Sequence, residues 1–286
     1  MVQTGTAPNT KGPRINKSRF AHKLFIEAYG VKVCIAATDA IARRVIRKML
    51  PDFLADSYTI VNEVEVDHTF YYVWNRSAKD SLYRNGEKVS VRTARTRALR
   101  QLSSLVRLAV AEFAVGHVFV HAGVVAWKGK AIVMPAKTFE GKSTLVMELV
   151  KRGAVYYSDE YAVIDKDGRV RPFPKMISLR LVPDDRSQTD HAVESFGGVA
   201  GTESIPVGLI LFTQYKPKCR WDPRPLTKGK GLIELIRDTI PIRTNPQFTL
   251  SVLKTMVENA AVIKSPRGDA EDASRLILAL FESHIA

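Results

Sequence analysis

The stretch from His117 to Asp165 reads HVFVHAGVVAWKGKAIVMPAKTFEGKSTLVMELVKRGAVYYSDEYAVID and carries the strongest fold signal in the chain. Its pattern predicts a strand, a turn, a strand, a loop with glycine and lysine, a helix, a glycine stop, a strand and an acidic pair. Residues Ala136 to Ser143, AKTFEGKS, match the phosphate-loop pattern G-x-x-x-x-G-K-[ST], except that Ala136 replaces the first glycine. The stretch therefore predicts an α/β domain that binds nucleotide phosphates.

The loop itself is the expected nucleotide site. Backbone N–H groups and a helix N-terminus would face the phosphates, Lys142 would add a positive charge, and Ser143 would place its hydroxyl on Mg²⁺. Ala136 weakens the match, because alanine resists a positive φ and adds a methyl group beside the phosphate. The alternative is that these residues only cap the helix, with the Lys142 side chain extending into solvent. The residues expected to contact ATP are Ala136, Lys137, Thr138, Phe139, Glu140, Gly141, Lys142, Ser143 and Thr144.

Two other segments are expected to return to this loop. In a βαβ unit the strand after the helix runs parallel to the strand before it, which would bring Asp159 and Glu160 beside the loop. One carboxylate could accept the proton of a hydroxyl while the other holds magnesium. If Lys128-Gly129 form a two-residue hairpin turn, the register places His121 opposite Ala136. The alternatives are that Asp159 and Glu160 simply end the strand in a turn, and that His121 is an ordinary residue of the core.

These residues together resemble the catalytic domain of the HPr kinase/phosphorylase family and its wider set of HPr-kinase-like ATP-binding proteins. The matching text is VHAGVVAWKGKAIVMPA, EGKSTLVMELVKRG and AVYYSDEYAVI. The resemblance covers residues 118–165 well and the remainder to residue 286 only in outline. It implies an α/β fold with a mixed sheet around the phosphate loop, akin to phosphoenolpyruvate carboxykinase.

By this resemblance, Lys142 would bind the β- and γ-phosphates, and Asp159 would be the general base toward a hydroxyl. Ser143 and Glu160, with Asp159 beside them, would hold Mg²⁺, and His121 would orient the base and the phosphate. Glu160 stands where the family usually has a second aspartate.

The expected function is ATP-dependent phosphorylation of a serine-like hydroxyl on an unidentified small molecule or peptide. The family's later R-G-L-G-type signature is absent between Arg171 and Pro206, so neither HPr as substrate nor the reverse phosphorylase reaction is carried over. Arg180 could contact the transferred phosphate, although a strand arginine is more often part of a surface ion pair. The main alternative is an ATP-binding regulatory protein without kinase turnover.

Charge suggests a third class, nucleic-acid binding. The 43 Lys and Arg against 29 Asp and Glu give the 286-residue chain a net charge of +14. Five arginines lie in a stretch without acids, but no aromatic residue follows them until Phe113, so a solvated basic helix is favoured over nucleic acid. The five are Arg92, Arg95, Arg97, Arg100 and Arg107.

The remaining chain suggests three parts: a disordered basic lead-in at 1–18, a small α/β module at 19–110, and the ATP-binding domain at 111–286. Two lone cysteines and the lack of an apolar leader favour a cytoplasmic protein without a membrane span. The chain could also form a homo-oligomer.

The expected elements of the first module are two strands broken at Gly30, a helix from about Asp39 to Leu50 with Thr38 as a cap and Pro51 as its stop, and a hairpin at Asn85-Gly86. A helix is expected at 94–115 and a polar loop at 183–203. An apolar strand at VGLILF and helices near 232–237, 249–261 and 270–283 complete the expected elements.

Overall fold

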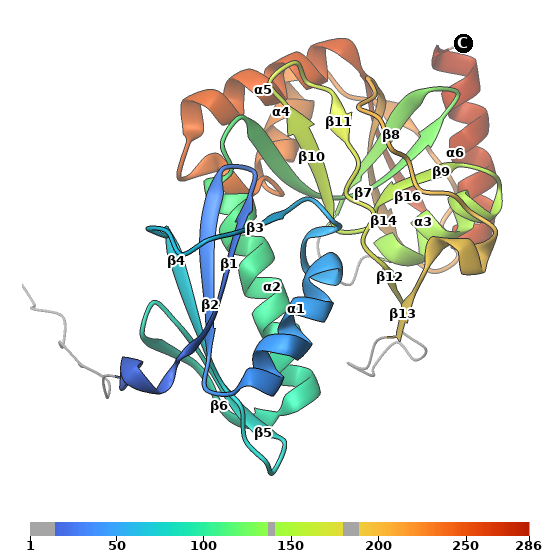
Figure 1. The fold of residues 1–286 in the computed structure, drawn as a ribbon. Coiled ribbons are helices and arrows are strands. Elements are labelled where there is room, and N and C mark those ends of the chain that lie inside the picture. Colours follow the sequence, from blue (N-terminus) through green and yellow to red (C-terminus); the bar gives the residue numbers. More distant parts are fainter. Residues whose placement is uncertain (1–14, 137–140, 180–188, 286) are drawn as a thin grey trace, which may run out of the picture. The chain divides into compact units, whose positions relative to one another are not determined.

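The computed structural model of the chain describes residues 15–136, 141–179 and 189–285 (Figure 1). It confirms the mixed α/β class. The chain divides into two compact units, one made by the described residues up to Phe53 together with Tyr58–Ala109, the other by Leu54–Ser57 and the described residues from Val110 onward.

Unit 1 is built on a mixed sheet in the order β3-β1-β2-β4-β5-β6. Helices α1 (Ala40–Leu54) and α2 (Arg95–Phe113) run beside each other (Figure 1), and Arg107 Nη1 donates to the Phe53 carbonyl of α1 at 3.3 Å. A short 3-10 turn, Lys17–Arg19, precedes the sheet. The strands are β1 (His22–Ala28), β2 (Val31–Ala37), β3 (Thr59–Val61), β4 (His68–Val73), β5 (Lys79–Arg84) and β6 (Glu87–Ala94).

The turns of unit 1 agree with the prediction from the sequence, but the end of α1 does not. The break at Gly30 and the Asn85-Gly86 hairpin are both observed, with φ of 51° at Asn85 and 92° at Gly86. Pro51 lies inside α1 and does not stop it, because the buried Phe53 and Leu54 keep the last turn packed. The expected Thr38 cap is also wrong, because Thr38 Oγ1 accepts from Trp74 N at 3.0 Å.

Unit 2 is built on a larger sheet in the order β11-β10-β7-β8-β14-β16-β15, with β9 also paired to β7. Strands β8, β14 and β16 are parallel neighbours, and the other pairs are antiparallel. A separate two-stranded sheet joins β12 (Ile177–Leu179) to β13 (Thr189–His191). The strands of the larger sheet are β7 (His117–Trp127), β8 (Lys130–Pro135), β9 (Val155–Ser158), β10 (Tyr161–Asp165), β11 (Val170–Arg171), β14 (Val207–Tyr215), β15 (Arg224–Pro225) and β16 (Ala261–Arg267).

Two hydrophobic clusters cover the two faces of this sheet. Helices α3 (Lys142–Lys151) and α6 (Ala270–Ile285) contribute to one cluster with Leu209 of β14, and α4 (Lys228–Ile236) and α5 (Pro246–Asn259) contribute to the other with Ile210. Successive residues of β14 thus face opposite layers, as the period of a strand requires. The 3-10 turns Val193–Phe196 and Ile240–Ile242 complete the unit.

Two expectations for unit 2 need correction. The polar loop expected at 183–203 contains β13 and a 3-10 turn in its described part. The helix expected to run to Ala261 ends at Asn259, and the following β16 pairs with β14 on one side and β15 on the other. Pro266 is tolerated within β16 because β15 pairs only with Lys264 and Ile263.

No helix in the described part of the chain is long and apolar enough to cross a membrane.

Candidate functional site

The β7–β8 hairpin places His121 beside the start of the loop. The pairing of Trp127 with Lys130 confirms the two-residue turn at Lys128-Gly129, whose φ values are 48° and 77°. As expected, His121 faces Ala136, whose N–H donates to the His121 carbonyl at 3.4 Å. The register of a hairpin follows from its turn, which is why this placement could be read from the sequence.

The strand that follows α3 returns to the same edge of the sheet by an unexpected route. Strand β9 pairs antiparallel with β7, as β8 does, so β8 and β9 run in the same direction with β7 between them. Asp159, which directly follows β9, accepts a hydrogen bond from Ser143 Oγ at 3.1 Å. Asp159 therefore reaches the N-terminal turn of α3, although β9 is not the neighbour of β8.

Lys142 lies against His121 at the beginning of α3. Its Nζ is 3.1 Å from His121 Nδ1, 3.2 Å from Nε2, and donates to the Ala136 carbonyl at 2.8 Å. Burial, and then the charge of Lys142, lowers the pKa of His121 to about 4. A neutral imidazole at this position can accept a hydrogen bond from the lysine and leaves the ammonium as the positive charge of the pair.

Asp159 is almost fully buried, with 6% of its surface exposed. Besides the bond from Ser143, Oδ1 accepts from Tyr156 Oη at 3.2 Å and Oδ2 accepts from Ser178 N at 3.2 Å. Burial raises the pKa of Asp159, and the nearby Lys175 opposes that rise. The carboxyl group is held in a fixed orientation with an increased affinity for a proton.

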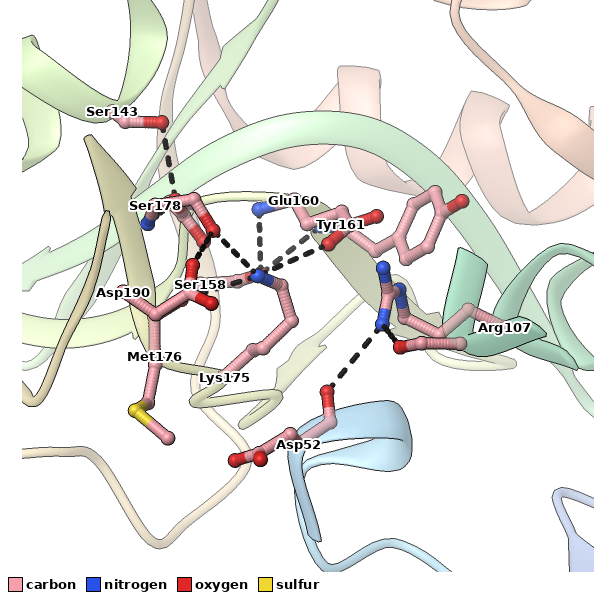
Figure 2. A network of polar contacts seen from close by, with 12 residues as sticks. Asp52, Arg107, Ser143, Ser158, Glu160, Tyr161, Lys175, Met176, Ser178 and Asp190 are labelled. Carbon is pink, nitrogen blue, oxygen red and sulfur yellow. Dashed lines mark hydrogen bonds and ion pairs between the residues drawn. The ribbon is translucent and has the colours of Figure 1, made fainter. Parts of the chain in front are cut away.

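Glu160 faces a lysine that the sequence did not single out. Lys175 Nζ lies 3.5 Å from Glu160 Oε2 and also donates to Ser178 Oγ at 3.1 Å and the Met176 carbonyl at 3.2 Å (Figure 2). Ser178 Oγ in turn donates to Asp190 at 2.6 Å. This network ties the acidic pair to the β12–β13 sheet, and only the positive charge of Lys175 could have signalled it in the sequence.

Figure 2 also draws a contact within unit 1. Arg107 Nη1 donates to the Asp52 carbonyl at 3.4 Å and to Ser103 Oγ at 2.7 Å. Arg107 is 7% exposed. One of the five arginines that suggested nucleic-acid binding is therefore a buried residue that holds the end of α1.

A second basic residue that the sequence did not single out lies at the start of α3. Arg267, at the end of β16 and 2% exposed, donates from Nη2 to the Gly141 carbonyl at 2.9 Å. Gly141 has a φ of 76°, and a Cβ there would stand 2.6 Å from Arg267 Nη2. Glycine is therefore favoured at this position by conformation, and a larger residue would displace the end of the Arg267 side chain.

Ala136 does not have the conformation that was expected to disfavour it. It is buried and is absent from the residues with positive φ, so alanine can occupy the first position of the loop motif without backbone strain. The expected contacts Lys137, Thr138, Phe139 and Glu140, and also Arg180, lie outside the described residues. Thr144 is exposed in the first turn of α3.

The residues offered for Mg²⁺ form a partial ligand set. Ser143, Asp159 and Glu160 supply oxygen ligands, which suit magnesium, and the buried Asp159 carboxylate would be favoured by a nearby cation. Within residues 15–136, 141–179 and 189–285 no group of three or more His, Cys, Asp or Glu side chains is arranged to hold a metal ion. Their oxygen atoms are of the kind that magnesium prefers, but these three residues alone do not form a metal site.

Comparison with known proteins finds similarity among solved structures. No protein-family model and no curated protein matches the chain. Among solved structures, the Hpr(Ser) kinase/phosphatase from Coxiella burnetii is similar over 58% of this chain and 95% of that chain, with 17% sequence identity and a TM-score of 0.33.

Proposed function

We propose that unit 2 is an ATP-dependent kinase that transfers the γ-phosphoryl group to a serine-like hydroxyl of a small molecule or peptide. The observation that supports this most is the 3.1 Å hydrogen bond between Ser143 and Asp159. It joins the N-terminal turn of a helix, suited to phosphate, to a buried carboxyl group suited to accept a proton.

The residues around this bond supply the groups that phosphoryl transfer requires. Lys142 and the N-terminus of α3 would bind the phosphates, and the neutral His121 would orient the Lys142 ammonium. Ser143, Glu160 and Asp159 would hold Mg²⁺, which when bound offsets the negative charge of the β- and γ-phosphates.

Asp159 would act as the general base. Its carboxylate takes the proton of the acceptor hydroxyl, the acceptor oxygen forms a bond to the γ-phosphorus, and the bond from that phosphorus to the β–γ bridging oxygen breaks to release ADP. The raised pKa of Asp159 favours this role, because a base accepts a proton best when its pKa lies close to the working pH.

One observation favours an ATP-binding protein without turnover. Both oxygens of Asp159 already accept hydrogen bonds, from Ser143, Tyr156 and the Ser178 backbone. A carboxylate so engaged could serve only to hold the site together.

Replacement of the proposed base separates the two functions. With Asp159→Asn, transfer from γ-labelled ATP to fractionated cell extract should fall about 10²–10⁴-fold, the usual contribution of a general base. ATP binding, measured by calorimetry, should be retained. Asp167→Asn, at an exposed turn, is the matched control and should keep full transfer.

Three results would argue against kinase chemistry. The first is that Asp159→Asn transfers phosphate as fast as the unchanged protein. The second is that the unchanged protein binds MgATP but labels no fraction of the extract, and the third is that it binds no ATP. The second result would leave the ATP-binding regulator as the function, and the third would exclude both.

A further inference from the structure

A cavity of about 340 Å³ opens in unit 2 at the carboxyl ends of the parallel strands β8, β14 and β16. The end of α4 forms its remaining wall. Its volume is within the range of small-molecule sites, and the carboxyl ends of parallel strands are the usual position for a ligand in an open α/β sheet. The residues that matter for its chemistry are Pro135, Phe212, Thr213, Gln214, Glu234 and Lys264.

The cavity and the acidic pair lie on opposite sides of strand β7 in the larger sheet. Strands β9 and β10 pair with β7 on one side and β8 pairs with it on the other, while β14 and β16 follow β8. Asp159 follows β9, whereas the cavity begins at Ala136, directly after β8. Three strand spacings of about 4.8 Å separate β9 from β14, a span that a triphosphate and its nucleoside can cover.

The charges in the cavity wall largely cancel. Glu234 pairs with Lys264 at 2.9 Å and with Arg237 at 2.9 Å, and these two cations lower the pKa of Glu234. Asp238 and Lys216 add one charge of each sign. A wall with so little excess positive charge is better suited to a neutral polar group than to a second phosphate or an acidic peptide.

The rest of the wall combines apolar surface with hydrogen-bonding groups. Pro135, Phe212 and Pro266 give flat apolar contacts, while Gln214 offers both a donor and an acceptor. This combination of apolar surface and hydrogen-bonding groups suits a flat ring that carries polar atoms.

We infer that this cavity holds the nucleoside, base and ribose, of the nucleotide whose phosphates lie at the start of α3. The inference rests on the proposed ATP-dependent function. It assigns the acceptor to the other side of β7, next to Asp159 and Glu160.

The test compares ligands that contain and lack a nucleoside. Phe212 and Gln214 lie two residues apart on β14 and therefore on the same side of the sheet, so Gln214→Trp should fill the cavity. Binding of ATP should weaken at least tenfold, whereas binding of inorganic triphosphate should be unchanged. Ile233→Trp, at a residue 60% exposed on α4 and outside the cavity wall, is the matched control and should bind both ligands normally.

The possible results separate this inference from the proposed function. If Gln214→Trp binds ATP normally, the cavity is not the nucleoside site. If that variant also fails to label an acceptor, the cavity belongs to the acceptor instead. If the unchanged protein binds neither ATP nor triphosphate, the proposed function fails and the inference fails with it. If both ligands weaken equally in Gln214→Trp, the substitution has disturbed the phosphate site, and the selective loss that the inference requires is absent.

Discussion

At the scale of single residues, His121 and Asp159 have pKa values shifted in opposite directions by the same cause. Burial disfavours the charged form of each, which lowers the pKa of the imidazole to about 4 and raises that of the carboxyl. At neutral pH His121 is therefore uncharged beside Lys142, and the positive charge of the pair belongs to the lysine.

His121 should make stability depend on pH in a predictable direction. Between pH 6.5, near the value of an unfolded histidine, and about 4, the unfolded chain binds the extra proton, so the free energy of unfolding should fall as the pH falls. One group contributes at most about 1.4 kcal/mol per pH unit. Denaturant unfolding at several pH values should show a smaller slope in His121→Gln.

The raised pKa of Asp159 has the opposite sign, because its contribution is present at low pH and lost as the pH rises through its folded pKa. The unchanged protein and His121→Gln share this contribution from Asp159, so the difference between their slopes of stability against pH reports on His121 alone. An identical slope in the two proteins would contradict the proposed burial of a neutral imidazole.

At the scale of elements, local rules predicted turns better than helix ends. Both residues of the Asn85-Gly86 and Lys128-Gly129 turns have positive φ, as two-residue hairpin turns require. Pro51 lies within α1 because burial of the following residues outweighs the missing backbone donor. A turn depends on a few adjacent residues, whereas the end of a helix also depends on what its last turn packs against.

The β7–β8 turn offers a test at this scale. Lys128 has a φ of 48°, a conformation that asparagine adopts more readily than lysine, so Lys128→Asn should raise the free energy of unfolding by about 0.5 kcal/mol. The lost ion pair with Glu282 is exposed and should contribute little. Denaturant unfolding measures the change, and Lys128→Val, which places a β-branched residue at positive φ, should lower stability instead. Equal stability of the two variants would show that the turn does not limit the hairpin.

At the scale of the whole molecule, each unit has its own sheet and its own buried residues. In unit 1 the fully buried Asp80 accepts hydrogen bonds from Tyr72 Oη at 2.8 Å, Asn75 N at 2.8 Å and Arg95 Nε at 2.9 Å. This one carboxylate ties β4 and β5 to the first residue of α2, while the proposed site draws its residues from unit 2.

Loss of this carboxylate should therefore affect one unit more than the other. Asp80→Ala leaves the Tyr72 hydroxyl and the Asn75 N–H without their acceptor, which should destabilise unit 1 by about 1–3 kcal/mol for each group. Hydrogen exchange followed by mass spectrometry should accelerate in β4 and β5 much more than in β8 and β14. Glu87→Ala, at an exposed position of β6, is the control and should change neither. Equal acceleration in both units would mean that they unfold together.

The sequence by itself determined the features that depend on neighbouring residues. The α/β class, the turn at Lys128-Gly129 and the register that brings His121 to Ala136 follow from patterns within a few residues of one another. Hydrophobic periodicity also located α3 and the strand on either side of it, because the faces of these elements must alternate between core and surroundings.

Only the tertiary structure decided which distant segments meet. It placed β7 between β8 and β9, made a strand of residues 261–267, and brought Arg267 to Gly141, 126 residues away. It also set Lys175 against Glu160 and opened the cavity between β14, β16 and α4. Such contacts depend on how whole layers pack, and the free energy of that packing is shared among many residues, so no short stretch of sequence records it.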